Sequence, residues 1–221
     1  MHYPFLLYSR KIDHRPLFKD LQGDPYIADL SGTGRLFGRV DRRDQWEFQK
    51  ILEYEMGTEL SWGVAAYLEN RAELLADCPQ MVAEQRFIHL GLDIIVPLGT
   101  PLHAPLKSTV AESGYESGEG NYGGFVLLRH DSPHFQSFYS FYGHLRRSSL
   151  PGIEQIFAAG EPFAEIGDFN ENGNWFHHTH LQVITAKGLD NGYIAKGYCS
   201  ERDLAQMDSL CPSPLSLFKV F

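Results

Sequence analysis

The sequence lacks the features of membrane and secreted proteins. None of its apolar runs approaches the roughly 20 residues that a membrane-spanning helix needs. Its first residues have no basic lead-in and no small-residue cleavage site, so a secretory signal is not indicated. The three cysteines, Cys78, Cys199 and Cys211, are far apart and form no CxxC pair, which argues against a disulfide scaffold and against a thiolate zinc site. We therefore expect no membrane partner and a cytoplasmic location.

Basic residues are also scarce. The 221 residues contain 19 Lys and Arg against 28 Asp and Glu, a formal net charge of −9. Nucleic-acid binding relies on a basic surface that releases counterions, so we expect no nucleic-acid partner. Histidine is unusually frequent, with ten residues, eight of which lie in the middle and the last third of the chain.

The pattern of apolar residues changes near residue 87. Residues 1–38 have the Pro and Gly content of loops, residues 41–56 have helical spacing that stops at Gly57, and residues 61–75 suggest a second helix before Pro79. From Phe87 onward, short aromatic and β-branched runs alternate with Gly, Pro, Asn and Asp clusters, which is typical of antiparallel sheets. We expect a mainly β protein in which residues 1–80 form a loop and helical cap. Residues 81–221 should form a β-rich domain, with an irregular tail after Ala186.

The first candidate motif is His89-Leu-Gly-Leu-Asp93. In a strand, His89, Gly91 and Asp93 share one face, and Gly91 leaves space between an imidazole and a carboxylate for a metal ion. Taken alone, the motif is better explained by a half-buried strand whose polar face meets water.

Two further histidine motifs follow. In His177-His-Thr-His180, a strand would place His178 and His180 on one face, as two metal ligands or as one ligand beside a proton-transfer group. The alternative is a polar strand end, with His177 the first candidate for a bystander. His144, in the sequence Tyr-Gly-His-Leu, ends an aromatic run and matters only if the fold brings it to the other motifs.

Three other patterns carry no chemistry in this interpretation. Residues 118–123 spell GxGxxG, but a strand-like run follows instead of a helix, so we expect a glycine-rich hairpin turn. His130 and His134 have helical metal-ligand spacing, but Pro133 lies between them, so we expect a loop. His103, between two prolines, should be a surface strand residue.

In this order, the motifs resemble those of the lysostaphin-like zinc metallopeptidases that cut peptidoglycan cross-bridges. The likeness rests on HLGLDIIVPLGTPLHAPL, YGHL and GDFNENGNWFHHTHLQV, and it covers residues 87–184. It implies antiparallel sheets around an open groove, one Zn²⁺ ion bound by His89, Asp93 and His180, and catalytic roles for His144 and His178. The family usually has His-Leu-His-Phe after a proline, so Thr179 and Leu181 depart from the pattern and put the groove wall in doubt.

A finer likeness is to a cytoplasmic-looking subgroup found beside aminotransferase and sugar-kinase-like phosphotransferase domains. It rests on AYLENR before the first motif, ENGNW before the last, and the CPSP tail. We expect a metalloendopeptidase whose metal-activated water cleaves a peptide or amide, with peptidoglycan-derived material as one option. Two alternatives use the same ligands: a non-haem Fe(II) oxygenase with a two-histidine, one-carboxylate site, and a metal-binding domain without activity.

Overall fold

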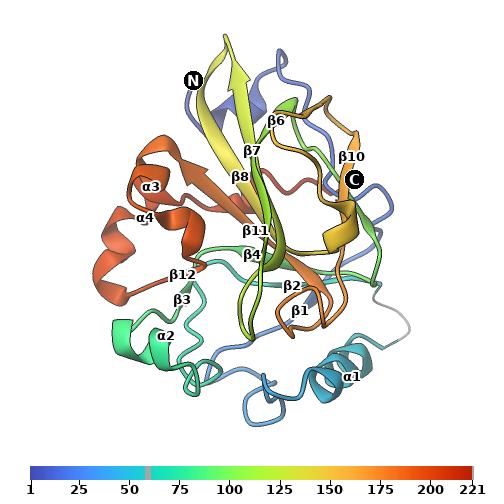
Figure 1. Ribbon diagram of the computed structural model, residues 1–221, viewed down its shortest axis with the longest axis vertical. Coiled ribbons are helices and arrows are strands. Elements are labelled where there is room, and N and C mark those ends of the chain that lie inside the picture. Colours follow the sequence, from blue (N-terminus) through green and yellow to red (C-terminus); the bar gives the residue numbers. More distant parts are fainter. Residues whose placement is uncertain (58–60, 221) are drawn as a thin grey trace.

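The computed structural model describes residues 1–57 and 61–220, and a large sheet crosses its centre (Figure 1). The eight strands, in sheet order, are β1 (Tyr26–Ile27), β2 (Gly63–Ala65), β4 (Leu92–Ile95), β11 (His178–Thr185), β8 (Phe135–Leu145), β7 (Gly123–Ser132), β6 (Ser108–Glu116) and β9 (Ile156–Phe157). Only β1 and β2 run parallel, and every other neighbouring pair is antiparallel. The predicted mainly β, antiparallel fold is confirmed.

Two small sheets and several short helices surround the large one. The paired strands are β5 (Pro101–His103) with β10 (Pro162–Glu165), and β3 (Ile88–His89) with β12 (Tyr198–Cys199). The α-helices are α1 (Gln45–Met56), α2 (Pro79–Glu84), α3 (Ala186–Asp190) and α4 (Met207–Leu210). The 3₁₀ turns are Phe5–Tyr8, Arg147–Ser149, Tyr193–Ala195, Glu201–Gln206 and Pro214–Ser216. Among the described residues, no helix has the length and apolar character needed to cross a bilayer.

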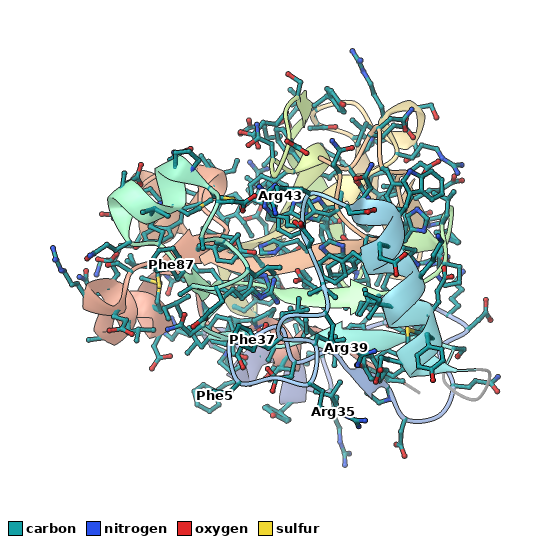
Figure 2. The ribbon with its side chains drawn as sticks, turned by 90° about the horizontal axis from the view of Figure 1, so that it is seen from below. Phe5, Arg35, Phe37, Arg39, Arg43 and Phe87 are labelled. Carbon is teal, nitrogen blue, oxygen red and sulfur yellow. The ribbon has the colours of Figure 1, made fainter. Side chains whose placement is uncertain are left out.

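Helix α1 forms where the sequence predicts it. The Asp44 side chain accepts a hydrogen bond from the Glu47 backbone N–H at 3.0 Å, which caps the first turn. Gly57 ends the helix with a φ of +63°, a conformation that favours glycine. Figure 2 shows Arg35 and Arg39 on the loop that leads into this helix.

The helix predicted for residues 61–75 is wrong. Residues 63–65 form the strand β2, which pairs with β1 on one side and with β4 on the other. Trp62 and Ala65 are buried there. A Cβ on Gly63 would lie 3.0 Å from the Tyr26 carbonyl oxygen. Pro79 does not follow a helix but opens α2, where its fixed φ suits the first turn.

The predicted division at residue 80 crosses a shared sheet. Strands β1 and β2, from the first 80 residues, extend the sheet through β4. The division of the chain into a cap, residues 1–80, and a β-rich domain, residues 81–221, stays a prediction. The tail after Ala186, expected to be irregular, contains α3, α4 and three of the 3₁₀ turns.

Strand β11 has two chemically different faces. Leu181 and Val183 are buried in an apolar core with Leu92 and Ile94 of β4. His178, His180 and Gln182 alternate with them and lie on the opposite face. The fold thus places a polar row on a central, buried strand.

The three patterns set aside have different outcomes. The glycine-rich turn is confirmed, since residues 118–123 connect β6 to β7. The loop expected over residues 130–134 is confirmed only for Pro133 and His134, which form the turn between β7 and β8. Strand β7 continues through Ser132, and the fully buried His130 lies 2.7 Å from the Ser140 hydroxyl. His103 does lie in a strand, but it is buried and not on the surface, and its backbone N–H donates a hydrogen bond to the Leu17 carbonyl at 2.8 Å.

Candidate metal centre

Strand register brings the predicted residues together. His180 of β11 pairs with Asp93 of β4 on one side and with Gly143 of β8 on the other. His89 ends β3 and is separated from the start of β4 by two residues, and His144 directly follows Gly143. The three motifs, spread over about 90 residues of sequence, therefore meet on three adjacent strands.

Two glycines make room for this convergence. A Cβ on Gly91 would lie 2.3 Å from Cε1 of His180, so the His180 ring occupies the space that a side chain would need. A Cβ on Gly143 would lie 2.8 Å from the Tyr122 ring. The space predicted at Gly91 is present, and it is filled by an imidazole from a strand that the local sequence could not identify.

Three potential ligand atoms form a compact triangle. His89 Nε2 lies 3.0 Å from His180 Nδ1, and Asp93 Oδ1 lies 3.2 Å from each of them. In a tetrahedral zinc site with ligand distances of about 2.0–2.1 Å, neighbouring ligand atoms are about 3.3 Å apart. The triangle has nearly the dimensions that such an ion requires.

The protonation of the two rings also fits a cation. His89 Nδ1–H donates to the Ala66 carbonyl at 2.9 Å, so its Nε2 carries a lone pair. His180 Nε2–H donates to the Gln182 amide oxygen at 3.0 Å, so its Nδ1 also carries a lone pair. The Gln182 amide nitrogen donates to backbone carbonyls 3.3 Å away, which fixes the direction of the amide. Three electron-rich atoms thus face one point, an arrangement that a divalent ion stabilises.

Asp93 is shared between this cluster and a buried arginine. Its Oδ2 accepts a hydrogen bond from Arg71 Nη1 at 2.8 Å, while Oδ1 faces the two histidines. Burial would raise the pKa of Asp93, but His89 and Arg71 outweigh it and hold the pKa well below the usual range. The carboxylate is therefore ionised and available as a ligand.

His144 and His178 lie next to the triangle, with their ring centroids 4.3 Å apart. His144 Nδ1–H donates to the Asn172 carbonyl at 2.7 Å, and His178 Nδ1–H donates to the Phe176 carbonyl at 2.8 Å. Only Nε2 of each ring is left to exchange a proton. Burial, with the neighbouring histidines, lowers the pKa of His144 well below its usual value. Burial lowers the pKa of His178 to about 4, so both rings are neutral near pH 7.

The backbone at His144 is unusual. Its φ of +65° lies in the left-handed region, which non-glycine residues seldom adopt. The register between β7 and β8 shifts here, because Gly124 pairs with Leu145 while Val126 pairs with Tyr142. A bulge of this kind redirects side chains at the end of a strand, and it accompanies the turn of His144 toward His178.

A cavity of about 210 Å³ opens beside these side chains. Asp93, His144, His178 and His180 line one part of it. Other residues contribute the remaining walls: Arg71, Gln80, Met81, Arg86, Glu116, Gly120, Asn121, Tyr122, Trp175, Ala195, Gly197 and Tyr198. The five predicted site residues therefore lie together, four of them at the wall of one cavity.

Several residues at the site were not assigned a role from the sequence. Arg71 and Asn172 belong to the AYLENR and ENGNW stretches that supported the resemblance, but neither pattern states what the residue contacts. Gln182 could have been found, since it continues the alternation of His178 and His180. Tyr122 lies inside the glycine-rich hairpin turn, residues 118–123, to which the sequence assigned no chemistry.

One family of known proteins matches the part of the chain that contains the site. Residues 87–191, just under half of the sequence, match the model of Peptidase family M23. No curated protein matches the chain. The matched range includes all five predicted site residues but not Arg71 or Arg86.

Similar solved structures are distant. An NMR structure of lysostaphin is 21% identical, with a TM-score of 0.37, and 45% of this chain covers 37% of it. A zinc-containing peptidase from Vibrio cholerae is 22% identical, with a TM-score of 0.37, and 45% of this chain covers 28% of it. The catalytic domain of lysostaphin from Staphylococcus simulans is 17% identical, with a TM-score of 0.39, and 54% of this chain covers 80% of it. The chain thus spans well under half the length of the first two.

Proposed function

We propose that the protein is a zinc-dependent hydrolase of peptide or amide bonds, with His89, Asp93 and His180 as the metal ligands. The observation that carries this proposal is the triangle of lone-pair atoms, 3.0–3.2 Å apart, whose ring tautomers are fixed by Ala66 and Gln182. The match of residues 87–191 to Peptidase family M23 supports the same reaction class.

The chain's own groups supply the proton transfers. A zinc ion held by the three ligands would polarise the scissile carbonyl and lower the pKa of water toward 7. His144 and His178 have neutral rings whose Nδ1–H groups are engaged by backbone carbonyls. Each can therefore accept a proton at Nε2 and return it to the leaving nitrogen. The amide C–N bond breaks, the oxygen of water joins the acyl carbon, and the products are a carboxylate and an ammonium group.

The metal and proton-transfer roles can be separated by substitution. We expect His180→Ala and His89→Ala to lose the metal and the activity together, because each removes one of only three protein ligands. We expect His144→Ala to retain one zinc per chain while kcat falls by about 10²–10⁴-fold. Elemental analysis and single-turnover assays measure both properties. Full zinc in His180→Ala would refute the ligand assignment, and iron with oxygen uptake in the purified protein would favour an oxygenase.

The proposed substrate is a peptide or another amide. Peptidoglycan-derived material is one candidate, although a polyanionic wall is a poor match for a chain with a net charge of −9. Digestion of purified sacculi by the zinc-loaded protein tests this candidate, and the absence of released muropeptides would count against it. The likeness to the subgroup found beside aminotransferase domains stays a prediction.

A further inference from the structure

The cavity beside the candidate metal centre has an unusual set of buried donors. Arg71 has an exposed fraction of 2% and Arg86 of 7%, and both line the cavity together with Tyr122. Arginine side chains are rarely buried unless every N–H group finds a partner, because desolvating an unpaired donor is costly. Their presence in one small cavity therefore needs an explanation.

Arg71 is only partly satisfied by the protein. Its Nε donates to Glu69 at 2.7 Å, and its Nη1 donates to Asp93 at 2.8 Å and to the Tyr198 hydroxyl at 3.3 Å. Its Nη2 is buried and has no hydrogen-bond partner among the described residues. One edge of the guanidinium is thus held in place while a further donor stays available.

Arg86 and Tyr122 repeat this arrangement. Arg86 Nε lies 2.7 Å from a Glu84 carboxylate oxygen as an ion pair, but neither its Nε nor its Nη1 makes a hydrogen bond in the described part of the chain. The buried Tyr122 hydroxyl also has none there, and it lies next to Gly197, where a Cβ would approach it to 2.8 Å. Three residues that line the same cavity, two arginines and one tyrosine, therefore each have a buried donor without a partner among the described residues.

A negatively charged acceptor complements these donors best. Guanidinium groups bind carboxylate and phosphate through paired, charge-assisted hydrogen bonds, and neither arginine can act as an acceptor. The cavity volume of about 210 Å³ lies below the usual range of about 300–1,000 Å³ for small-molecule pockets. It suits the end of a chain better than an extended segment.

The short distance between Arg71 and the ligand triangle favours a carboxylate on the residue next to the scissile bond. Arg71 contacts one oxygen of Asp93, and the other oxygen of the same carboxylate belongs to the ligand triangle. Consecutive residues are about 3.8 Å apart, so a terminal carboxylate at Arg71 would leave the preceding amide beside the triangle.

We propose that Arg71, Arg86 and Tyr122 form a carboxylate-binding subsite that selects substrates with a free C-terminus. This inference rests on the proposed amide hydrolysis and makes it exo-acting, whereas the family resemblance predicts an endopeptidase. Hydrolysis would release the last residue with its carboxylate intact and with a new ammonium group.

Binding to the metal-free protein tests the subsite apart from catalysis. The probes are propionate and its neutral analogue propionamide, measured by calorimetry or by the fluorescence of Trp175, which lines the cavity. We expect propionate to bind about ten-fold tighter than propionamide, and Arg86→Gln and Tyr122→Phe to weaken propionate selectively. Arg43→Gln is the matched control, because the Arg43 side chain is 66% exposed, pairs with Asp41 and Asp77, and is not among the residues that line the cavity. Equal binding of the two probes, or equal effects of Arg86→Gln and Arg43→Gln, would overturn the proposal.

Two more arms identify the ligand and separate the hypotheses. Tighter binding of inorganic phosphate than of propionate would overturn the choice of a carboxylate. With zinc-loaded protein, N-acetylglycylglycine should be cleaved with a kcat/KM at least about 100-fold above that of its C-terminal amide. If neither peptide is cleaved while propionate binding still depends on Arg86, the hydrolase proposal fails and the subsite stands. If the amide is cleaved equally well, the subsite proposal fails and the hydrolase stands.

Arg71 itself needs a conservative variant. It is enclosed between Glu69 and Asp93, so removing its charge would leave two buried acids unpaired and endanger the fold. Arg71→Lys keeps the charge but loses the paired donors, and we expect weaker propionate binding in a variant that circular dichroism shows to be folded. Undiminished binding in the folded Arg71→Lys protein would remove Arg71 from the subsite.

Discussion

Gly91 determines how closely β11 can approach the segment between β3 and β4. The His180 ring occupies the position of the missing side chain, so even a methyl group would lie 2.3 Å from it. Such a contact forces the ring to move, and with it the Nδ1 atom that faces His89 and Asp93. The absence of a side chain at Gly91 thus determines where the His180 ring lies relative to His89 and Asp93.

Gly91→Ala should therefore weaken metal binding more than it weakens the fold. We expect zinc affinity to fall by about ten-fold or more, as it does when groups that support a metal ligand are removed. Competition with a chromogenic chelator measures the affinity. Gly152→Ala is the matched control, because a Cβ there meets nothing within 4 Å. Unchanged affinity in Gly91→Ala would show that the His180 ring is not held where the structure has it.

Gln182 has a similar supporting role through its amide oxygen. Gln182→Met keeps the volume but removes the acceptor of the His180 Nε2–H group. We expect zinc affinity to fall by about 10–100-fold with little change in secondary structure. Retained affinity, measured by the same competition assay with circular dichroism as a check, would mean that the His180 tautomer does not depend on this contact.

The sequence suggests all three side chains of the triangle but not the groups that support them. The alternation of residues in strands correctly places His178 and His180 on one face, while the choice of His89, Asp93 and His180 as ligands depends on the family resemblance. Arg71 could not be assigned, because its contact with Asp93 joins two segments that no local periodicity relates. The roles of all five predicted residues stay predictions until a metal is measured.

Among the elements, α1 supports the start of β11. Phe48 of α1 packs against Phe176 with ring centroids 4.8 Å apart, and Phe176 stacks on His178 at 4.2 Å. The Gln49 side chain also accepts a hydrogen bond from the His177 backbone N–H at 2.8 Å. A helix outside the family-matched range thereby positions a proposed proton-transfer residue.

Phe48→Ala should both destabilise the protein and loosen His178. Phe48 is 1% exposed, and truncation of a buried phenylalanine costs about 3–5 kcal/mol of unfolding free energy. Urea denaturation measures the stability, and the width of the His178 ring resonances in NMR measures the order of the ring. Tyr54→Ala, on the same helix but 80% exposed, should change stability by less than about 0.5 kcal/mol. Sharp His178 resonances in a destabilised Phe48→Ala protein would argue against the coupling.

The predictability of the elements follows the range of the interactions that form them. Helix α1 depends on local signals, the Asp44 cap and the Gly57 stop, and was found. Strand β2 depends on pairing with β1 and β4, partners that are distant along the chain, and was mistaken for a helix. The hairpin turn between β6 and β7 was predicted, because these strands are consecutive in sequence and a glycine-rich segment joins them.

For the molecule as a whole, buried histidines make stability depend on pH. His130 is completely buried, away from the cavity, and burial lowers its pKa to about 4. Between pH 6.5 and 4, the unfolded chain binds a proton at this position that the folded chain does not, so stability falls as the pH falls. His130 alone should contribute a loss of about 3 kcal/mol over this range.

His130→Gln should therefore flatten the pH dependence of the unfolding free energy between pH 6.5 and 4. Urea denaturation at several pH values measures the slope in the wild type and in the variant. His134→Gln, on the exposed turn that follows β7, should leave the slope unchanged. Equal slopes in the wild type and His130→Gln would show that folding does not lower the pKa of His130.

The pairing of Asp93 with His180 and of His180 with Gly143 also bears on how the chain folds. A slip of β11 by a single position would bring Thr179 or Leu181 opposite Asp93 and turn the imidazoles toward the apolar layer. Only the correct alignment of three strands creates a place for an ion. Uptake of zinc during refolding should consequently lag behind collapse and report the moment at which the central strands reach their final alignment.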